Sequence, residues 1–314
     1  MQTRTKFSAY TKFSLITLLY NFLVILWGVF LRASKSGDGC GQHWLTCHGE
    51  VIPAAPAFKT VIEFSHRIST AIAGLLVLVM LIWALRKFKF SDLPLRFATL
   101  SFVFIIFEVL IGAALVLTGN TADTWTPTRP FWMAGHLIIT FGLLAVLTLN
   151  VWSVDKGALG RPKSKILLFS MVALTSGILL TGVSGSVAAL SNMLHKSASL
   201  TEGLMQDFSS ESPIIVRLRI FHPIISTIVA AGLVFFAGWA RRTFSTERSL
   251  LRLGVWLEIV VIIQVACGVA TIFLGAPIVM QLIHLFLADL VWILFVLIAA
   301  ELFLKRGSAG GSEV

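Results

Sequence analysis

Eight long apolar runs, separated by short polar connections, dominate the pattern of this 314-residue chain. A run of about 20 residues is long enough for a helix to cross a hydrocarbon layer of about 30 Å. Backbone groups in lipid must be satisfied internally, so we expect transmembrane helices. The runs cover approximately residues 13–31, 62–85, 97–118, 132–152, 166–190, 217–240, 253–275 and 279–303.

Composition agrees with this pattern. The chain is 57% hydrophobic and only 13% charged, with a mean hydropathy of +0.90, whereas soluble domains carry roughly 25% charged residues. The first run is longer than the apolar part of a signal peptide, so we expect a retained helix. The predicted fold class is an all-α membrane protein with eight transmembrane helices.

The net charge of +10 arises from basic residues in the short connections, which argues against a nucleic-acid partner. By the positive-inside rule, the side that carries them faces the cytoplasm. The protein is then predicted to lie in the cell membrane with both termini on the cytoplasmic side. The segments predicted to face outward are residues 32–61, 119–131, 191–216 and 276–278. The basic residues are Arg4, Lys6, Lys12, Arg86, Lys87, Lys89, Arg96, Lys156, Arg161, Lys163, Lys165, Arg241, Arg242, Arg248, Arg252, Lys305 and Arg306.

The chain repeats itself at a shift of 156 residues. LRFATLSFVFIIFEVLIGAALVLTG from Leu95 aligns without a gap to LRLGVWLEIVVIIQVACGVATIFLG from Leu251, and His66 falls on His222. Four helices per unit make the two halves parallel repeats about an axis near the membrane normal. We predict two tandem four-helix bundles, residues 1–155 with the outer loop 32–61 and residues 156–306, followed by a disordered tail, 307–314.

Four of the seven histidines lie near the outer starts of the even-numbered runs: His66, His136, His222 and His284. Two imidazoles from facing helices can supply both axial ligands of a heme iron. Zinc is the rival, but it requires about four ligands, and each half offers two histidines. A single histidine near a helix end is often only interfacial; its repetition at equivalent positions favours ligation.

Small and basic residues surround these histidines. The glycines would admit a flat macrocycle, or else serve close helix packing. The arginines are candidate partners for heme propionates, or else interfacial residues whose heads reach water. The glycines are Gly74, Gly112, Gly135, Gly142, Gly232 and Gly268, and the arginines are Arg32, Arg67, Arg129, Arg217 and Arg219.

The halves differ in their carboxylates. Arg219 stands at the position of Glu63, and Gln264 at that of Glu108. Glu63 shares a helical face with His66 and Arg67, while an ionisable residue at the depth of Glu108 is costly and suggests function, or else a protonated carboxyl bonded between helices. We therefore predict chemistry in the first half and electron transfer through a bis-histidine heme in the second.

The first outer loop contains Cys40 and Cys47. On an oxidising face, two such cysteines favour a disulfide, although a metal pair with His43 and His48 is the alternative. The third cysteine, Cys267, lies alone in an apolar run and is predicted to be a small packing residue.

Together these motifs resemble heme A synthase: C-G-x-x-W-x-x-C-H-G from Cys40 to Gly49, E-x-x-H-R from Glu63 to Arg67, the four histidines and the duplicated chain. The resemblance spans nearly the whole sequence. It implies oxidation of the C8 methyl of heme O, through a hydroxymethyl stage, to the formyl of heme A for cytochrome oxidase.

The resemblance also implies residue roles. His66 and His136 would bracket the substrate heme with Glu63 assisting, and His222 and His284 would ligate heme b. The cysteine pair would serve activity or stability. The implied partners are heme O synthase (a protoheme farnesyltransferase) and cytochrome oxidase assembly factors. The sequence is also compatible with assembly into a homo-oligomer.

The chain departs from the family pattern twice. Leu45 stands where many relatives carry proline, and the outer loop 191–216 lacks the cysteine pair that some relatives have. We expect that loop to be held by other means, such as a short amphipathic helix over the second heme. Rival functions are a diheme b-type electron carrier, such as a quinol or thiol dehydrogenase subunit, and a transporter of a planar substrate.

Overall fold

The computed structural model describes residues 7–121, 125–154, 156 and 165–303. Apart from an isolated β-bridge between Cys47 and Glu50, the regular secondary structure of these residues is helical. The predicted tail 307–314 lies outside these residues. The helices are α1 (Ala9–Ala33), α2 (Phe58–Lys87), α3 (Leu93–Leu117), α4 (Arg129–Ser153), α5 (Lys165–Leu194), α6 (Leu200–Phe208), α7 (Ile214–Leu218), α8 (Phe221–Thr243), α9 (Arg248–Phe273) and α10 (Ile278–Phe303).

Eight segments of the described chain are long and apolar enough to cross a membrane. They coincide with the eight predicted runs, α7 and α8 together forming the sixth, Ile214–Thr243. The all-α, multi-pass prediction is thereby confirmed. Many large apolar side chains on these helices, including Leu75, Phe235 and Ile262, are exposed, as expected for surfaces that contact lipid.

The sixth span is interrupted, which the apolar pattern alone did not predict. Helix α7 ends at Leu218 and α8 begins at Phe221. Pro223 explains the break, because proline lacks an N–H and its ring clashes with the carbonyl four residues earlier, here that of Arg219. The corresponding position of the first half is Arg67, and α2 runs through it without interruption.

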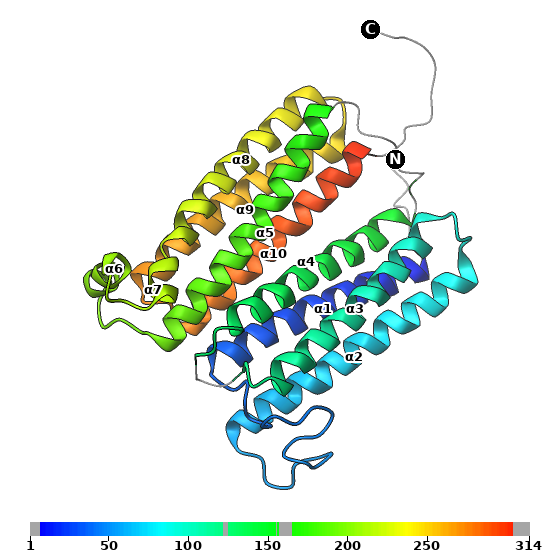
Figure 1. Cartoon of the computed structure of the whole chain (residues 1–314). Coiled ribbons are helices and arrows are strands. Elements are labelled where there is room, and N and C mark those ends of the chain that lie inside the picture. Colours follow the sequence, from blue (N-terminus) through cyan, green and yellow to red (C-terminus); the bar gives the residue numbers. More distant parts are fainter. Residues whose placement is uncertain (1–6, 122–124, 155, 157–164, 304–314) are drawn as a thin grey trace, which may run out of the picture.

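The helices form two groups, α1 to α4 and α5 with α8 to α10 (Figure 1). Within them, the contacts of α1 with α2, α2 with α3 and α3 with α4 recur as α5 with α8, α8 with α9 and α9 with α10. Between the groups, α4 contacts α10, and the contact of α1 with α10 corresponds to that of α5 with α4. A two-fold parallel repeat with its axis between α4 and α10 would produce this pattern, and the domain boundaries themselves remain a prediction.

The seam between the groups contains directional contacts. The indole N–H of Trp292 donates to the carbonyl oxygen of Phe141 at 2.8 Å, and the two rings stack with centroids 5.6 Å apart. Near the C-terminal end of α10, the Glu301 carboxylate accepts from Lys156 Nζ at 2.8 Å and Trp152 Nε1 at 2.9 Å. These bonds fix α10 against α4 and the segment after it.

Both large connections lie at the same end of the molecule, the lower left of Figure 1. One is the loop between α1 and α2, which contains the disulfide; the other contains α6. The first turns of α2, α4, α8 and α10 begin at this end, so the fold brings the four histidines near these helix starts to a common level.

Candidate functional site

The four histidines lie in the first third of their helices: His66 in α2, His136 in α4, His222 in α8 and His284 in α10. Each is partly buried. His66 and His136 are close enough to interact electrostatically, and His222 and His284 are in ring contact. The fold therefore brings the predicted residues together as one pair in each half.

The second pair has the spacing that an iron ligand pair requires. The ring centroids of His222 and His284 are 6.3 Å apart, and the ring planes are perpendicular at 89°. Metal–nitrogen bonds of about 2 Å, with about 1.1 Å from each nitrogen to its ring centre given ring bonds near 1.3 Å, sum to about 6 Å. The residues present thus fit a bis-histidine heme.

Glycines provide the space that three of the rings occupy. A Cβ at Gly28 would lie 3.1 Å from Cε1 of His66, one at Gly185 would lie 2.9 Å from Cε1 of His222, and one at Gly268 would lie 3.0 Å from Cε1 of His284. Gly28 in α1 and Gly185 in α5 are equivalent at a shift of 157 residues. The rings therefore lie against the glycine backbone of a neighbouring helix, where a side chain would collide with them. We call Gly28, Gly185 and Gly268 the glycine seats of the imidazoles.

The fourth histidine faces a carboxylate. His136 Nδ1 lies 3.6 Å from Glu108 Oε2, and neither buried atom has a hydrogen-bond partner among the described residues. The other Glu108 oxygen accepts from the Thr140 hydroxyl. At 3.6 Å the nitrogen and the carboxylate are not yet bonded, and a small rotation of the imidazole would close the pair.

The equivalent pair in the second half is Gln264 and His284. Gln264 Nε2 lies 3.4 Å from His284 Nε2. Glu108 and Gln264, which occupy equivalent helix positions, therefore lie beside equivalent histidines of the two halves. Only in the first half is that neighbour a potential proton acceptor.

Sequence comparison supplies the family. The profile of the COX15-CtaA family, described as cytochrome oxidase assembly protein, matches residues 11–296. This chain belongs to that family. Relatives include a heme A synthase of Halalkalibacterium halodurans, 28% identical over 285 residues that cover 89% of this chain and 92% of the relative. A heme A synthase of Alkalihalophilus pseudofirmus is 25% identical over 87% of this chain and 90% of the relative.

Longer relatives also match. A protoheme IX farnesyltransferase of Thermus thermophilus is 40% identical over 298 residues, which cover 93% of this chain but 48% of the relative. This COX15-CtaA chain therefore spans about half the length of that protein, and the other half of the Thermus protein has no counterpart here.

The family's E-x-x-H-R motif has an evident structural role in this chain. One Glu63 oxygen accepts from the backbone N–H of Cys40 at 2.8 Å, and the other is paired with the Arg67 guanidinium. Arg67 Nη1 also donates to the carbonyls of His43 at 2.7 Å and Thr46 at 2.8 Å. Glu63 is only 3% exposed, so this clamp attaches the first loop to α2.

The loop itself is closed by the predicted disulfide between Cys40 and Cys47. Since both sulfurs are used in this bond, they are not available as thiolate ligands for the alternative metal site, and His48 Nε2 is bonded to the Gly39 carbonyl at 2.8 Å. Leu45 has a φ of +76°, which proline cannot adopt. A proline at this position would therefore require a different backbone path.

A corresponding clamp holds the second large connection. Arg219 is paired with Asp207 of α6 and donates to the carbonyl of Gly203 at 2.8 Å and to Asn192 Oδ1 at 3.1 Å. The short helix expected in this loop is therefore present and held by Arg219; its place over the second heme stays a prediction. Its apolar residues Leu204, Met205 and Phe208 are 47%, 70% and 76% exposed.

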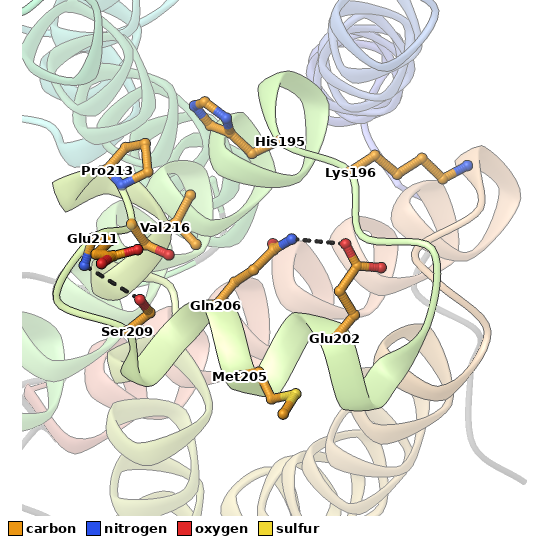
Figure 2. A pocket seen from close by; sticks show the side chains of 10 residues that line it. His195, Lys196, Glu202, Met205, Gln206, Ser209, Glu211, Pro213 and Val216 are labelled. Atoms are coloured by element: carbon orange, nitrogen blue, oxygen red, sulfur yellow. Dashed lines mark hydrogen bonds between the residues drawn. The ribbon is translucent and has the colours of Figure 1, made fainter.

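A hollow of about 530 Å³ lies between the end of α5, α6 and α7 (Figure 2). His195, Glu202 and Gln206 line it, with Gln206 donating to Glu202 at 3.0 Å. None of the four paired histidines lines this hollow, so it is separate from the candidate heme sites.

The arginines predicted to bind heme propionates differ in their contacts and in their exposure. Arg67 and Arg219 are occupied by the two loop clamps, and Arg217 is exposed; their binding of heme stays a prediction. Arg129 is 3% exposed and interacts within the protein. Cys267 is buried and free, as predicted.

Apart from Gly268, which faces His284, the predicted glycines divide into two classes. A Cβ at Gly142 would collide with the Phe104 ring at 2.2 Å and one at Gly232 would approach Leu174 at 3.2 Å, so these serve helix packing. Nothing lies within 4 Å of a Cβ at Gly74, Gly112 or Gly135. Gly28 and Gly185 were missed, although extending the repeat to the first helix of each half would have found them.

Proposed function

We propose that this protein is a heme A synthase, an oxidoreductase that converts the C8 methyl group of heme O to the formyl group of heme A. The observation that carries the proposal is the unequal pair of histidine sites in a COX15-CtaA chain. Both halves present two histidines at one level, but among the described residues only the first half places a carboxylate, Glu108, beside one of them.

In this proposal the second half is the site of a resident heme b, with His222 and His284 as its axial ligands. Their centroid distance of 6.3 Å supports this assignment. Bound there, the heme would accept and pass on single electrons. The protein holds the two imidazoles on the glycine seats of α5 and α9 at the required separation.

The first half binds the substrate, with His66 and His136 bracketing heme O. Oxidation of a methyl carbon removes protons as well as electrons, so a nearby carboxylate is needed as proton acceptor or to orient water. Glu108 faces His136 with one oxygen free of hydrogen bonds. Glu63, the other carboxylate whose position in the second half carries none, has both oxygens bonded, one to the loop and one to Arg67.

The synthase proposal is tested by extraction and chromatography of hemes from cells that make heme O, with and without this protein. Heme A should appear only with the protein. Retention of heme without any heme A would instead favour the diheme electron carrier. Glu108→Gln should keep heme b and lower the yield of heme A, while Glu63→Gln tests the role that the family resemblance implies.

The Thermus relative supports a neighbouring partner. That protein is named for farnesyl transfer to protoheme IX and contains, in one polypeptide, a region similar to this chain and about as much sequence again. We propose that this chain receives its substrate from a farnesyltransferase of that kind. Co-purification of the two tagged proteins, with a soluble protein as control, tests this partner.

The membrane orientation is part of the same proposal. The histidine pairs and the disulfide would lie toward the outer, oxidising side of the cell membrane, opposite the basic residues Arg86, Arg241 and Arg252. Labelling of single cysteines in the loop 34–57 by a membrane-impermeant reagent, in a background lacking Cys40 and Cys47, would check it. Labelling only after lysis would refute it.

A further inference from the structure

Among the four histidines, His222 has a side-chain hydrogen bond that determines the state of its ring. Ser184 Oγ in α5 lies 3.2 Å from His222 Nδ1. The same hydroxyl donates to the carbonyl oxygen of Thr181 at 3.0 Å. A serine hydroxyl has one hydrogen; with that hydrogen on the Thr181 carbonyl, Ser184 accepts from His222, whose Nδ1 then carries the proton.

This tautomer leaves the lone pair of Nε2 free for a metal. Histidine ligands almost always donate their other ring N–H to a fixed acceptor, which sets both tautomer and orientation. Gly185, the next residue after Ser184, provides the seat for the ring at 2.9 Å from Cε1.

The first half lacks this arrangement. At the shift of 157 residues that superposes Gly28 on Gly185, Ser184 falls on Trp27. The Trp27 indole N–H donates to Ser65 at 3.3 Å, and His66 Nδ1 is buried without a hydrogen-bond partner in the described chain. His66 therefore has a glycine seat but no acceptor that fixes its tautomer.

We infer that Ser184 is a positioning residue for His222, and that this bond makes the second half the site that keeps its heme while the first half exchanges its own. The inference rests on the proposed function, in which the first half must accept heme O and release heme A. A permanent cofactor and a passing substrate require different rates of release, and the unequal support of His222 and His66 provides that difference.

Three variants of α5 test the inference. Ser184→Ala removes the acceptor, and Ser184→Thr keeps a hydroxyl at the same place. Ser186→Ala is the matched control, since the Ser186 hydroxyl donates to the Val183 carbonyl at 2.8 Å on the same helix. A general weakening of α5 would affect both alanine variants, whereas loss of the histidine bond affects only one.

The measurement is the rate at which heme b leaves the purified full-length protein for an excess of apomyoglobin, with His222→Ala used to assign the second-half heme. Loss of such a supporting contact typically lowers metal affinity about 10- to 100-fold. We expect about a 10-fold faster release from Ser184→Ala, at the lower end of that range. The midpoint potential and low-spin ferric EPR signal of that heme should also change.

Wild-type behaviour is expected for Ser184→Thr and Ser186→Ala. Equal release rates for Ser184→Ala and Ser186→Ala would overturn the inference, as would unchanged heme b in His222→Ala. Heme A yield, measured in parallel, separates this result from the proposed function. Absence of heme A with a specific Ser184→Ala effect would refute the synthase and leave only the positioning role of Ser184 standing.

Discussion

Replacement of Gly185 by alanine should release the second-half heme without unfolding the protein. The new Cβ would lie 2.9 Å from Cε1 of His222, whereas carbon atoms in contact are about 3.5 Å apart or more. The ring must therefore retreat by about 0.6 Å. Since metal–ligand distances hold to within about 0.2 Å, this displacement is incompatible with the present ligation.

The free-energy cost should fall on heme binding. Without heme the imidazole can move away from the methyl group, because it is the end of a side chain and not backbone. With heme bound it cannot, and overpacking of this size costs about 1 to 3 kcal/mol. The affinity for heme b should therefore fall about 5- to 150-fold, while the thermal midpoint of the heme-free protein stays nearly unchanged.

The repeat provides a pair of control positions. Gly268→Ala should act like Gly185→Ala, because its Cβ would lie 3.0 Å from Cε1 of His284. Gly112→Ala, at the equivalent position of the first half, meets nothing within 4 Å and should leave heme b content unchanged. Heme per protein, determined from the pyridine hemochrome spectrum, measures all three. Full heme b in Gly185→Ala would refute the reasoning.

Three further outcomes concern stability. Arg67→Ala should destabilise the first loop by about 3 kcal/mol, because it leaves the buried Glu63 carboxylate unpaired. Limited proteolysis of the purified protein should then show new cuts between residues 34 and 57. An unaltered cleavage pattern would contradict this expectation. The Cys40–Cys47 bond joins cysteines seven positions apart, and its reduction should lower the free energy of unfolding by about 2 kcal/mol. The thermal midpoint should therefore fall when reductant is added. The same reductant should not change the midpoint of a Cys40→Ser/Cys47→Ser double variant. Asp289→Asn should preserve or raise the thermal midpoint, since Asp289 is 0% exposed and neither carboxylate oxygen has a bond in the described chain; a lower midpoint would reveal a missing partner.

The apolar pattern was sufficient to predict the eight spans, because long apolar runs have few alternatives in a membrane protein. The break before α8 could also have been predicted, since Pro223 excludes a regular helix at Arg219. Repeat comparison correctly brought the histidines together in pairs. It did not extend to the first helix of each half, where the seats Gly28 and Gly185 lie, because those two helices share little sequence beyond their glycines.

The loop clamps could not be predicted in the same way. Glu63 accepts from the backbone N–H of Cys40, and Arg67 donates to two loop carbonyls. Backbone groups leave no signature in the sequence, and their positions depend on the path of a loop in which Leu45 and His48 have positive φ. From the sequence alone, the E-x-x-H-R motif therefore allowed a catalytic role for Glu63. The contacts that Glu63 makes with Arg67 and the loop explain its presence without such a role.

The difference between the halves at Glu63 has a structural cause. In the first half, Arg67 binds the loop and its carboxylate partner, Glu63, comes one turn earlier on the same helix. In the second half, Pro223 replaces the arginine and interrupts the helix, Arg219 takes the place of Glu63, and α6 supplies the carboxylate of Asp207. Each half thus keeps one arginine and one carboxylate to hold its outer connection.

The substitution of Glu63 by Arg219 therefore follows from how each connection is attached, and does not by itself mark the reactive half. The other difference, Glu108 against Gln264, has no such explanation. Both side chains lie beside the second histidine of their pair, and only the first can take up a proton. Because a buried carboxylate with a free oxygen is costly to maintain in a membrane, Glu108 is the stronger indication that chemistry takes place in the first half.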